Sequence, residues 1–318
     1  MNTTHTRAAV AISRGALALA TLLTACGGGG GSAAPSVATP SPPPPVMSAD
    51  LVAQPWNTQL DSSASHTIAG DVSIIASFPM PQLNRTRRIW IYLPAGYAAS
   101  TARYPVLYLQ DGQNVFDTAT SYAGEWGVDE AMLQMEQESP ALRAIVVAID
   151  NGGTAREDEY LPSGHAHQYV DFLVQTLKPY IDSHYRTDPG REHTAIGGSS
   201  YGAYVSLYAG LTHQDIFGMV LAFSNVSIYD GGALQGIIAG AGRQQDMRIY
   251  LDTGALEEAQ FPGVVASDQQ TWQLLLAQGF SAQHLRFVVD PQGTHGEASW
   301  RRRFPAAWRG FWLPAPAP

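Results

Sequence analysis

The chain has 318 residues, one cysteine and a formal net charge of −9, from 27 acidic and 18 basic side chains. A single cysteine excludes a disulfide within the chain. The acidic balance and the lack of a long basic run argue against nucleic-acid binding, and the arginine cluster at 301–303 is expected on the solvent-exposed face of a last helix.

The N-terminal residues have the pattern of an export signal. Arg7 and Arg14 precede an apolar run at 15–23 that is too short to span a membrane as a mature helix. This run leads into the sequence LTAC, which ends at Cys26 and resembles the lipobox of bacterial lipoproteins, whose cysteine is lipidated. We expect residues 1–25 to be a lipoprotein signal peptide and Cys26 to anchor the protein in the bacterial cell envelope, at the outer membrane. The alternative is an ordinary cleaved signal with an incidental cysteine.

Residues 26–50 are predicted to be a tether between the lipid and the folded part of the chain. A glycine run follows Cys26, and four consecutive prolines stand at 42–45. Glycine runs are flexible and proline runs are stiffer, but neither can build a core. We therefore expect residues 51–318 to form a single domain.

Short apolar runs alternate with helix-like stretches over the rest of the chain. The segments 71–78 and 87–94 alternate apolar and polar side chains, as half-buried strands do, and are expected to pair as a hairpin. Further strands are expected in continuously apolar runs, at 106–109, 144–149, 194–196, 219–223, 248–251 and 285–289. Helices are expected at 167–185, at 268–279 with Gly279 as the C-cap, and at 299–312, where Pro305 kinks or restarts the helix. This alternation predicts an α/β fold with a mostly parallel sheet and helices on both faces.

The sequence AIGGSSYGAY, which begins at Ala195, contains a candidate nucleophile. In the pattern G-x-S-x-G, a glycine stands two residues on either side of the serine, because the sharp turn from strand to helix leaves no room for side chains there. Ser200 fits this pattern between Gly198 and Gly202, whereas Ser199 would require a glycine where Tyr201 stands. The alternative is a tight glycine-rich turn without a chemical role.

Two backbone amides are candidates for an oxyanion hole. One belongs to Tyr201, the residue after the candidate nucleophile. The other belongs to Gln113, beyond the permissive Gly112 in the loop QDGQNVFD that follows the strand at 106–109. The second loop can equally be a simple turn, since its residues are common in turns.

A carboxylate and a histidine complete the candidate constellation. Asp252, Glu257 and Glu258 follow the strand at 248–251, and spacing alone does not choose among them. His295 lies on the loop between the last strand and the last helix, where a general base can reach the serine. The order serine, acid, histidine matches that of α/β-hydrolases and not those of chymotrypsin or subtilisin.

No metal site and no organic cofactor are expected. His165 and His167 stand two residues apart, but no further cysteine, histidine or glutamate cluster accompanies them. We interpret them as part of a polar loop before a helix, because such a pair alone is a weak metal signal.

Several segments together resemble the family of α/β-hydrolases that carries the name Putative esterase, which includes esterase D, feruloyl and acetylxylan esterases, enterochelin esterases and mycolyltransferases. The resemblance covers about 85–312 and rests on RRIWIYLPAGY, YPVLYLQDGQNVFD, EWGVDE, LKPYIDSHYRT, AIGGSSYGAY, YLDTGALEE and GTHGEASW. The family's acid commonly follows a glycine in G-x-x-[DE], which implies Glu257 instead of Asp252. Its histidine commonly stands in G-x-H, which matches His295. The chain departs from the family at two positions. Tyr201 stands where members often have methionine, and Ala203 stands where many have glycine.

These observations predict a serine carboxylic-ester hydrolase with the triad Ser200, His295 and Glu257 and an acyl-enzyme intermediate. The alternatives are an acyltransferase with the same triad, or a non-catalytic glycan-binding envelope protein on a hydrolase scaffold. The substrate is expected to be a small or glycan-linked ester, of which feruloyl, acetyl-sugar and siderophore-type esters are examples. Four aromatic residues could line a pocket for a phenolic acyl group or could belong to the core: Phe116, Trp126, Tyr160 and Tyr201.

Overall fold

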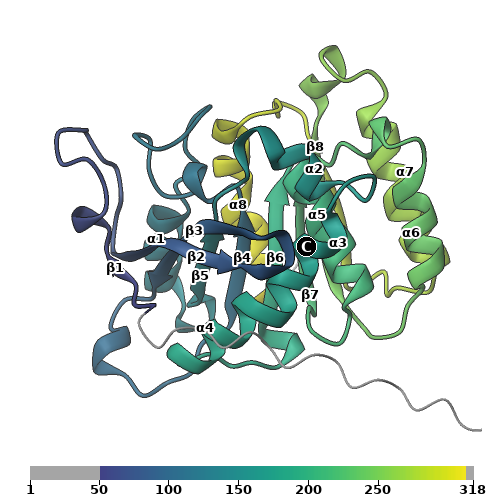
Figure 1. Cartoon of the computed structure of the whole chain (residues 1–318). Helices are drawn as coiled ribbons and strands as arrows, with labels where there is room; N and C mark the ends of the chain where they lie inside the picture. Colours follow the sequence, from purple (N-terminus) through teal and green to yellow (C-terminus); the bar gives the residue numbers. More distant parts are fainter. Residues whose placement is uncertain (1–50, 313–318) are drawn as a thin grey trace, which may run out of the picture. The chain divides into compact units, whose positions relative to one another are not determined.

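The central element of the fold is a nine-stranded sheet (Figure 1). The structure, a computed structural model, describes residues 51–312, so the predicted signal peptide and the whole predicted tether, with Cys26, lie outside the described residues. The strand order is β1-β2-β3-β5-β4-β6-β7-β8-β9. The bounds are β1 Gln54–Pro55, β2 Asp71–Met80, β3 Arg85–Leu93, β4 Val106–Gln110, β5 Ile145–Ile149, β6 Thr194–Ser199, β7 Met219–Phe223, β8 Arg248–Gly254 and β9 Leu285–Asp290.

The sheet is antiparallel at one end and parallel over the rest. The predicted hairpin is present, because β2 pairs antiparallel with β3, and its register shifts between Ile75 and Phe78. β3 then pairs antiparallel with β5, whereas every later pair, from β5–β4 to β8–β9, is parallel. The predicted mostly parallel α/β fold is therefore confirmed.

Successive residues of the central strands point to opposite faces and enter two separate cores. On β4, Leu107 and Leu109 pack in one core and Tyr108 in the other. β4, β5, β6 and β7 are buried along their full length, as their continuous apolar runs predict. The same expectation was wrong for β9, which is an edge strand and is partly exposed after its first residue, because its outer side has no neighbouring strand.

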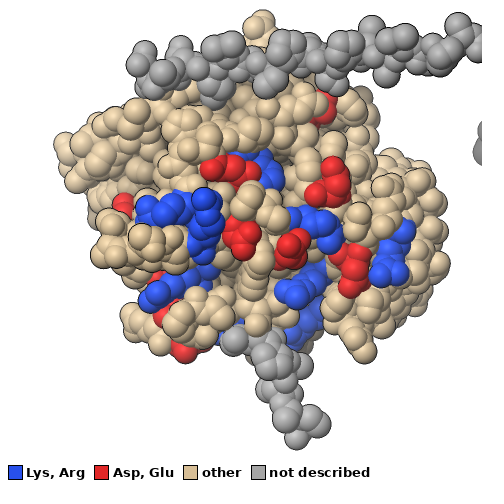
Figure 2. All heavy atoms as spheres, turned by 90° about the horizontal axis from the view of Figure 1, so that it is seen from below, with Lys and Arg blue, Asp and Glu red and all other residues tan. Residues whose placement is uncertain are grey.

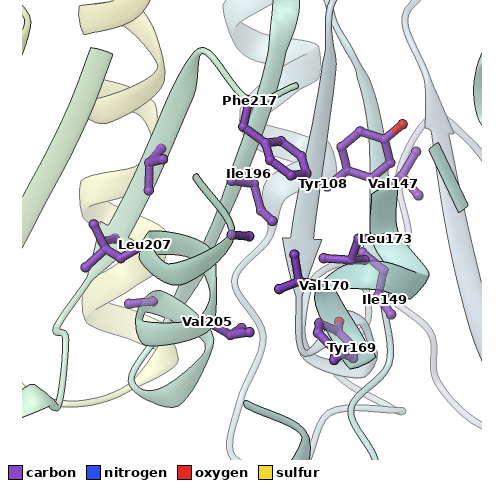
Figure 3. Close-up of a cluster of buried hydrophobic side chains, with 14 of the residues drawn as sticks. Tyr108, Val147, Ile149, Tyr169, Val170, Leu173, Ile196, Val205, Leu207 and Phe217 are labelled. Atoms are coloured by element: carbon purple, nitrogen blue, oxygen red, sulfur yellow. The ribbon is translucent and has the colours of Figure 1, made fainter. Parts of the chain in front are cut away.

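Helices cover both faces of the sheet. Their bounds are α1 Val128–Glu138, α2 Arg156–Tyr160, α3 Ala166–Phe172, α4 Lys178–His184, α5 Tyr201–Thr212, α6 Ala233–Ala241, α7 Val264–Ala277 and α8 Glu297–Trp312. Side chains of α3 and α5 pack on one face against β4, β5 and β6 (Figure 3). Side chains of α1 and α8 pack on the other face. We did not predict α1, α2 or α6.

The predicted helices differ from the observed ones in detail. The stretch at 167–185 forms α3, a π-helical segment at Leu173–Leu177 and α4. α7 ends at Ala277, and Gly279 follows with a φ of +89°. Pro305 lies inside α8, which continues past it to Trp312. No helix in the range 51–312 is long and apolar enough to cross a membrane.

The arginine cluster at 301–303 is divided between solvent and core. Arg301 and Arg302 are exposed, but Arg303 is buried, so the prediction of a fully solvated cluster was wrong for Arg303. Arg303 shares the buried face of α8 with Trp300 and Ala307, which are three and four residues away. On the face seen in Figure 2, acidic and basic side chains are interspersed, with no continuous basic surface.

Candidate active site

Ser200 stands on a sharp turn between β6 and α5. Its backbone has a φ of +57° and a ψ of −126°, a region that residues with side chains rarely adopt and that clusters at functional sites. The Ser200 amide donates to the Phe223 carbonyl of β7 at 3.0 Å, and its own carbonyl accepts from the amides of Ala203 and Tyr204 at 3.1 and 3.2 Å. Neighbouring backbone on both sides thus holds this conformation.

The two glycines around Ser200 are required by close approach. A Cβ on Gly198 would lie 2.8 Å from the carbonyl group of Gly202 and 2.9 Å from Cβ of Gln110. A Cβ on Gly202 would lie 3.0 Å from a carboxylate oxygen of Asp111. Because these contacts leave no space for a methyl group, they explain the spacing of the G-x-S-x-G pattern.

Glu257 and His295 form a hydrogen-bonded pair. The distance from His295 Nδ1 to Glu257 Oε2 is 2.8 Å, and Glu257 is buried. The other oxygen, Oε1, accepts from the Gly254 amide at 2.8 Å and from the Ser224 hydroxyl at 2.6 Å. Burial alone would raise the pKa of Glu257, but these hydrogen bonds, the one from His295 first, lower it below its usual value. The carboxylate therefore stays ionised beside the imidazole.

Two glycines allow the loops that carry this pair to touch. Gly254 ends β8, and Gly293 lies two residues before His295. A Cβ on Gly293 would lie 2.6 Å from Cα of Gly254, and the Leu256 amide donates to the Gly293 carbonyl at 3.0 Å. Any side chain at either position would separate the two loops.

The three candidate acids have different surroundings. Asp252 is buried and accepts from the Tyr250 hydroxyl at 2.9 Å and the Ser224 amide at 3.2 Å. Burial raises the pKa of Asp252 to about 7. Glu258 accepts from the amides of Gly263 and Val265 at the start of α7. Of the three, only Glu257 is hydrogen-bonded to His295 among the described contacts.

We did not predict the buried network behind Glu257. The Ser224 hydroxyl donates to Glu257 and accepts from Trp300 Nε1 and an Nη of Arg303, both at 2.8 Å. Arg303 also lies 3.1 Å from Asp252 through its Nε, so one buried cation stands between two buried carboxylates. No sequence motif marked Ser224, which has a φ of +50°. The burial of Arg303 could have been predicted, because Arg303 stands three residues after Trp300 on α8.

The predicted oxyanion residues lie at the carboxyl ends of β4 and β6, which are neighbours in the sheet. Tyr201 is the first residue of α5, so its amide has no partner within that helix. Gln113 lies in the 3-10 turn Gly112–Asn114. A Cβ on Gly112 would lie 2.8 Å from the carbonyl carbons of Ala148 and Ile149, so the missing side chain lets this turn rest on the end of β5.

A partly buried ion pair lies beside Tyr201. The guanidinium of Arg156 binds both oxygens of Asp111, at 2.6 and 2.8 Å, and lies 5.7 Å from the centre of the Tyr201 ring. Tyr201 is half-buried, whereas Phe116, Trp126 and Tyr160 are buried in the cores. Of the four aromatic residues considered for a pocket, Tyr201 alone keeps a partly exposed ring.

The serine and the histidine lie on one connected framework. The Ser200 amide is bonded to Phe223, and the next residue, Ser224, is bonded to Glu257, which holds His295. No hydrogen bond joins the Ser200 hydroxyl to His295 among the described residues, and in enzymes without substrate such contacts are often long. His165 and His167 are exposed and lie beside Asp158 and Asp171, apart from this framework.

Comparisons with known proteins identify the family of this chain. A family model described as "Putative esterase" matches residues 80–311. The chain is 22% identical over 235 residues to the uncharacterized protein YbbA of Bacillus subtilis, covering 69% of this chain and 89% of YbbA. It is 27% identical over 245 residues to the iron(III) enterobactin esterase of Escherichia coli K12, covering 73% of this chain and 55% of that enzyme.

Two of the solved structures that the chain resembles carry the name of an esterase. An enterochelin esterase from Shigella flexneri aligns with a TM-score of 0.63 at 22% identity, over 79% of this chain and 60% of that one. A ferulic acid esterase aligns with a TM-score of 0.58 at 20% identity, over 76% of this chain and 96% of that one. The chain spans about half the length of the enterobactin esterase that it matches in sequence. The chain belongs to the Putative esterase family, a family of carboxylic-ester hydrolases with the α/β-hydrolase fold.

Proposed function

We propose that this protein hydrolyses carboxylic esters through a triad of Ser200, His295 and Glu257. The observation that carries the proposal is the hydrogen bond from His295 Nδ1 to the buried carboxylate of Glu257. His295 follows β9 and Ser200 follows β6, so both stand at the carboxyl ends of strands in one sheet. Because Nδ1 is engaged, Nε2 is the nitrogen left to accept a proton.

The first half of the reaction acylates the enzyme. His295 Nε2 takes the proton of the Ser200 hydroxyl while Oγ attacks the ester carbonyl. The negative charge that develops on the carbonyl oxygen is stabilised by the amides of Tyr201 and Gln113. The tetrahedral intermediate collapses, its bond to the alkoxy oxygen breaks, and His295 gives its proton to the leaving alcohol.

The second half releases the acid. His295 takes a proton from a water molecule, which attacks the acyl carbonyl, and returns the proton to Ser200 as the acid departs. In both halves an imidazolium forms beside Glu257. The lowered pKa of Glu257 means that its carboxylate is ionised at neutral pH and stabilises that cation.

The surroundings of His295 favour a substrate with an aromatic acyl group. The Phe261 ring lies 4.6 Å from the His295 ring, and the exposed ring of Tyr229 lies 6.0 Å from Phe261. Aromatic rings pack favourably edge-to-face. Together with the names of the enterobactin and ferulic acid esterases, this favours phenolic esters over simple acetyl esters.

The adjacent serines provide a matched test. Ser200→Ala is expected to abolish hydrolysis of nitrophenyl and feruloyl esters and labelling by a fluorophosphonate probe, whereas Ser199→Ala retains both. Labelling of the Ser200→Ala variant would refute the assignment. Comparing feruloyl with acetyl esters of one alcohol tests the substrate class, and adding an alcohol acceptor tests the alternative of acyl transfer.

We also propose that Cys26 carries a lipid that anchors the protein in the cell envelope. The proposal rests on the LTAC sequence and the preceding apolar run. Metabolic labelling with a radioactive fatty acid should mark the wild-type chain and not the Cys26→Ala variant. Equal labelling of both would contradict it.

A further inference from the structure

Three carboxylates converge beside the predicted oxyanion turn, where the chain enters α1. One oxygen from each of Glu125, Asp129 and Glu130 lies within 4.8 Å of the other two. Asp129 is fully buried and Glu125 is 8% exposed, whereas Glu130 reaches the surface. None of the three takes part in the proposed hydrolysis.

Each carboxylate has one oxygen without a hydrogen-bond partner. Oδ2 of Asp129 accepts from the Ala69 amide at 2.6 Å, but its buried Oδ1 has no partner among the described residues. Oε2 of Glu125 accepts from the Thr118 hydroxyl at 2.8 Å, and its Oε1 is likewise unpartnered, as is Oε2 of Glu130. A buried, unpartnered carboxylate oxygen is costly, so three of them in one place point to a missing ligand.

Arg301 compensates only part of this charge. Its guanidinium lies 3.4 Å from Glu125 and 3.6 Å from Glu130, is 45% exposed, and forms no ion pair with Asp129 in the described structure. Neutralising the cluster requires further positive charge, which either a proton or a metal ion supplies.

We propose that Glu125, Asp129 and Glu130 bind one calcium ion. The available donors are all oxygens, which suit a hard divalent cation. Calcium binds oxygens at about 2.3–2.6 Å, so two of its ligands can lie up to about 5 Å apart. One oxygen of each carboxylate lies within 4.8 Å of the other two, which is inside this range. Calcium also accepts irregular sets of oxygen ligands, whereas magnesium demands near-ideal octahedral geometry. Water supplies the remaining ligands from the side of Glu130.

The ion would hold the loop before α1 against the predicted oxyanion turn. The amides of Trp126 and Tyr122 donate to the backbone and side-chain oxygens of Asn114, at 2.8 and 3.0 Å. Asn114 in turn donates to Glu297, two residues after His295. Calcium at the cluster thus stabilises a loop that contacts both sides of the candidate active site.

The test uses terbium, a luminescent substitute for calcium, and the full-length chain freed of metal with a chelator. Trp126 is adjacent to Glu125 in the sequence, so excitation of tryptophan should produce terbium emission that calcium displaces. Calcium at a hundredfold excess over its Kd should raise the melting temperature by roughly 5 °C. Glu138→Gln, at the other end of α1, is the matched control and should behave like the wild type.

The variants separate a metal site from a shared proton. Asp129→Asn and the more exposed Glu130→Gln should each weaken displacement by calcium at least tenfold, and Arg301→Ala should strengthen it by removing a competing cation. Calcium that neither displaces terbium nor shifts the melting temperature at 10 mM (roughly the weak end of calcium sites) would overturn the proposal. The proposal would also be overturned if the Asp129→Asn variant bound calcium as well as the wild type does and if, in the absence of metal, it were the more stable of the two. These measurements do not depend on ester hydrolysis.

Discussion

Replacing Gly293 with alanine should separate the two loops that carry Glu257 and His295. The new Cβ would lie 2.6 Å from Cα of Gly254, whereas ordinary carbon contacts begin near 3.5 Å. The backbones must therefore move apart by about 1 Å, which takes the His295–Glu257 distance from 2.8 Å to well beyond hydrogen-bonding range. A displacement of about 1 Å can cost about 100-fold in rate, or about 2.7 kcal/mol in the activation barrier.

The assay is steady-state hydrolysis of a nitrophenyl ester, with kcat and KM measured separately. We expect kcat to fall about 100-fold, because the loops that move carry the base and the carboxylate that orients it. Gly296→Ala, in the same loop, is the control, since a Cβ there meets no atom within 4 Å. A Gly293→Ala variant whose kcat is within about threefold of the Gly296→Ala value would refute the reasoning.

Three further predictions concern the buried acids and their support. Glu257→Gln should lower kcat by about 10²–10⁴-fold and Asp252→Asn by less than about tenfold; a larger loss in Asp252→Asn would identify it as the triad acid. Ser224→Ala leaves Trp300 Nε1 and one Nη of Arg303 without their acceptor and should lower the free energy of unfolding in urea by about 1–3 kcal/mol. An unchanged urea midpoint would contradict this. The pKa of Asp252 is about 7 in the folded protein and 3.8 in the unfolded chain. Its contribution to stability is therefore fully present below about pH 4 and is lost as the pH rises to about 7. The loss amounts to up to about 4 kcal/mol. Asp252→Asn should remove that slope from a plot of unfolding free energy against pH, and a slope that persists would assign it to another group.

Local sequence features were sufficient for most of the sheet, though not for β1, and for the sharp turn at Ser200. Continuous apolar runs located the strands from β4 to β8, because both faces of each are covered by helices. The spacing of Gly198 and Gly202 around Ser200 reflects contacts within one turn and the strand next to it. Apolar strands and close-packed glycines of this kind depend on contacts between adjacent elements, and nearly every α/β fold contains those contacts.

Other features depend on contacts between distant parts of the chain. Asp252, Glu257 and Glu258 stand within seven residues, and only the approach of Gly293 to Gly254 determines which of them meets His295. The exposure of β9 follows from its place at the edge of the sheet, which its own residues do not encode.

The acidic cluster and Arg303 illustrate the same limit. In the sequence, Asp129 and Glu130 are ordinary acidic residues in the first turn of a helix. Their convergence with Glu125 depends on the turn at Gly127, whose φ is +60°. In the sequence, Arg303 has the same side chain as its two exposed neighbours, and its burial depends on how α8 packs.

The position of α8 at the end of the described chain affects how the protein matures. Ser200 and Glu257 are synthesised before β9, His295 and the two residues of α8 that support Ser224. A nascent polypeptide that has completed only β8 therefore lacks both the base and the buried guanidinium. On the proposed mechanism, such a polypeptide is inert toward esters, and hydrolysis requires that β9, His295 and α8 have been added.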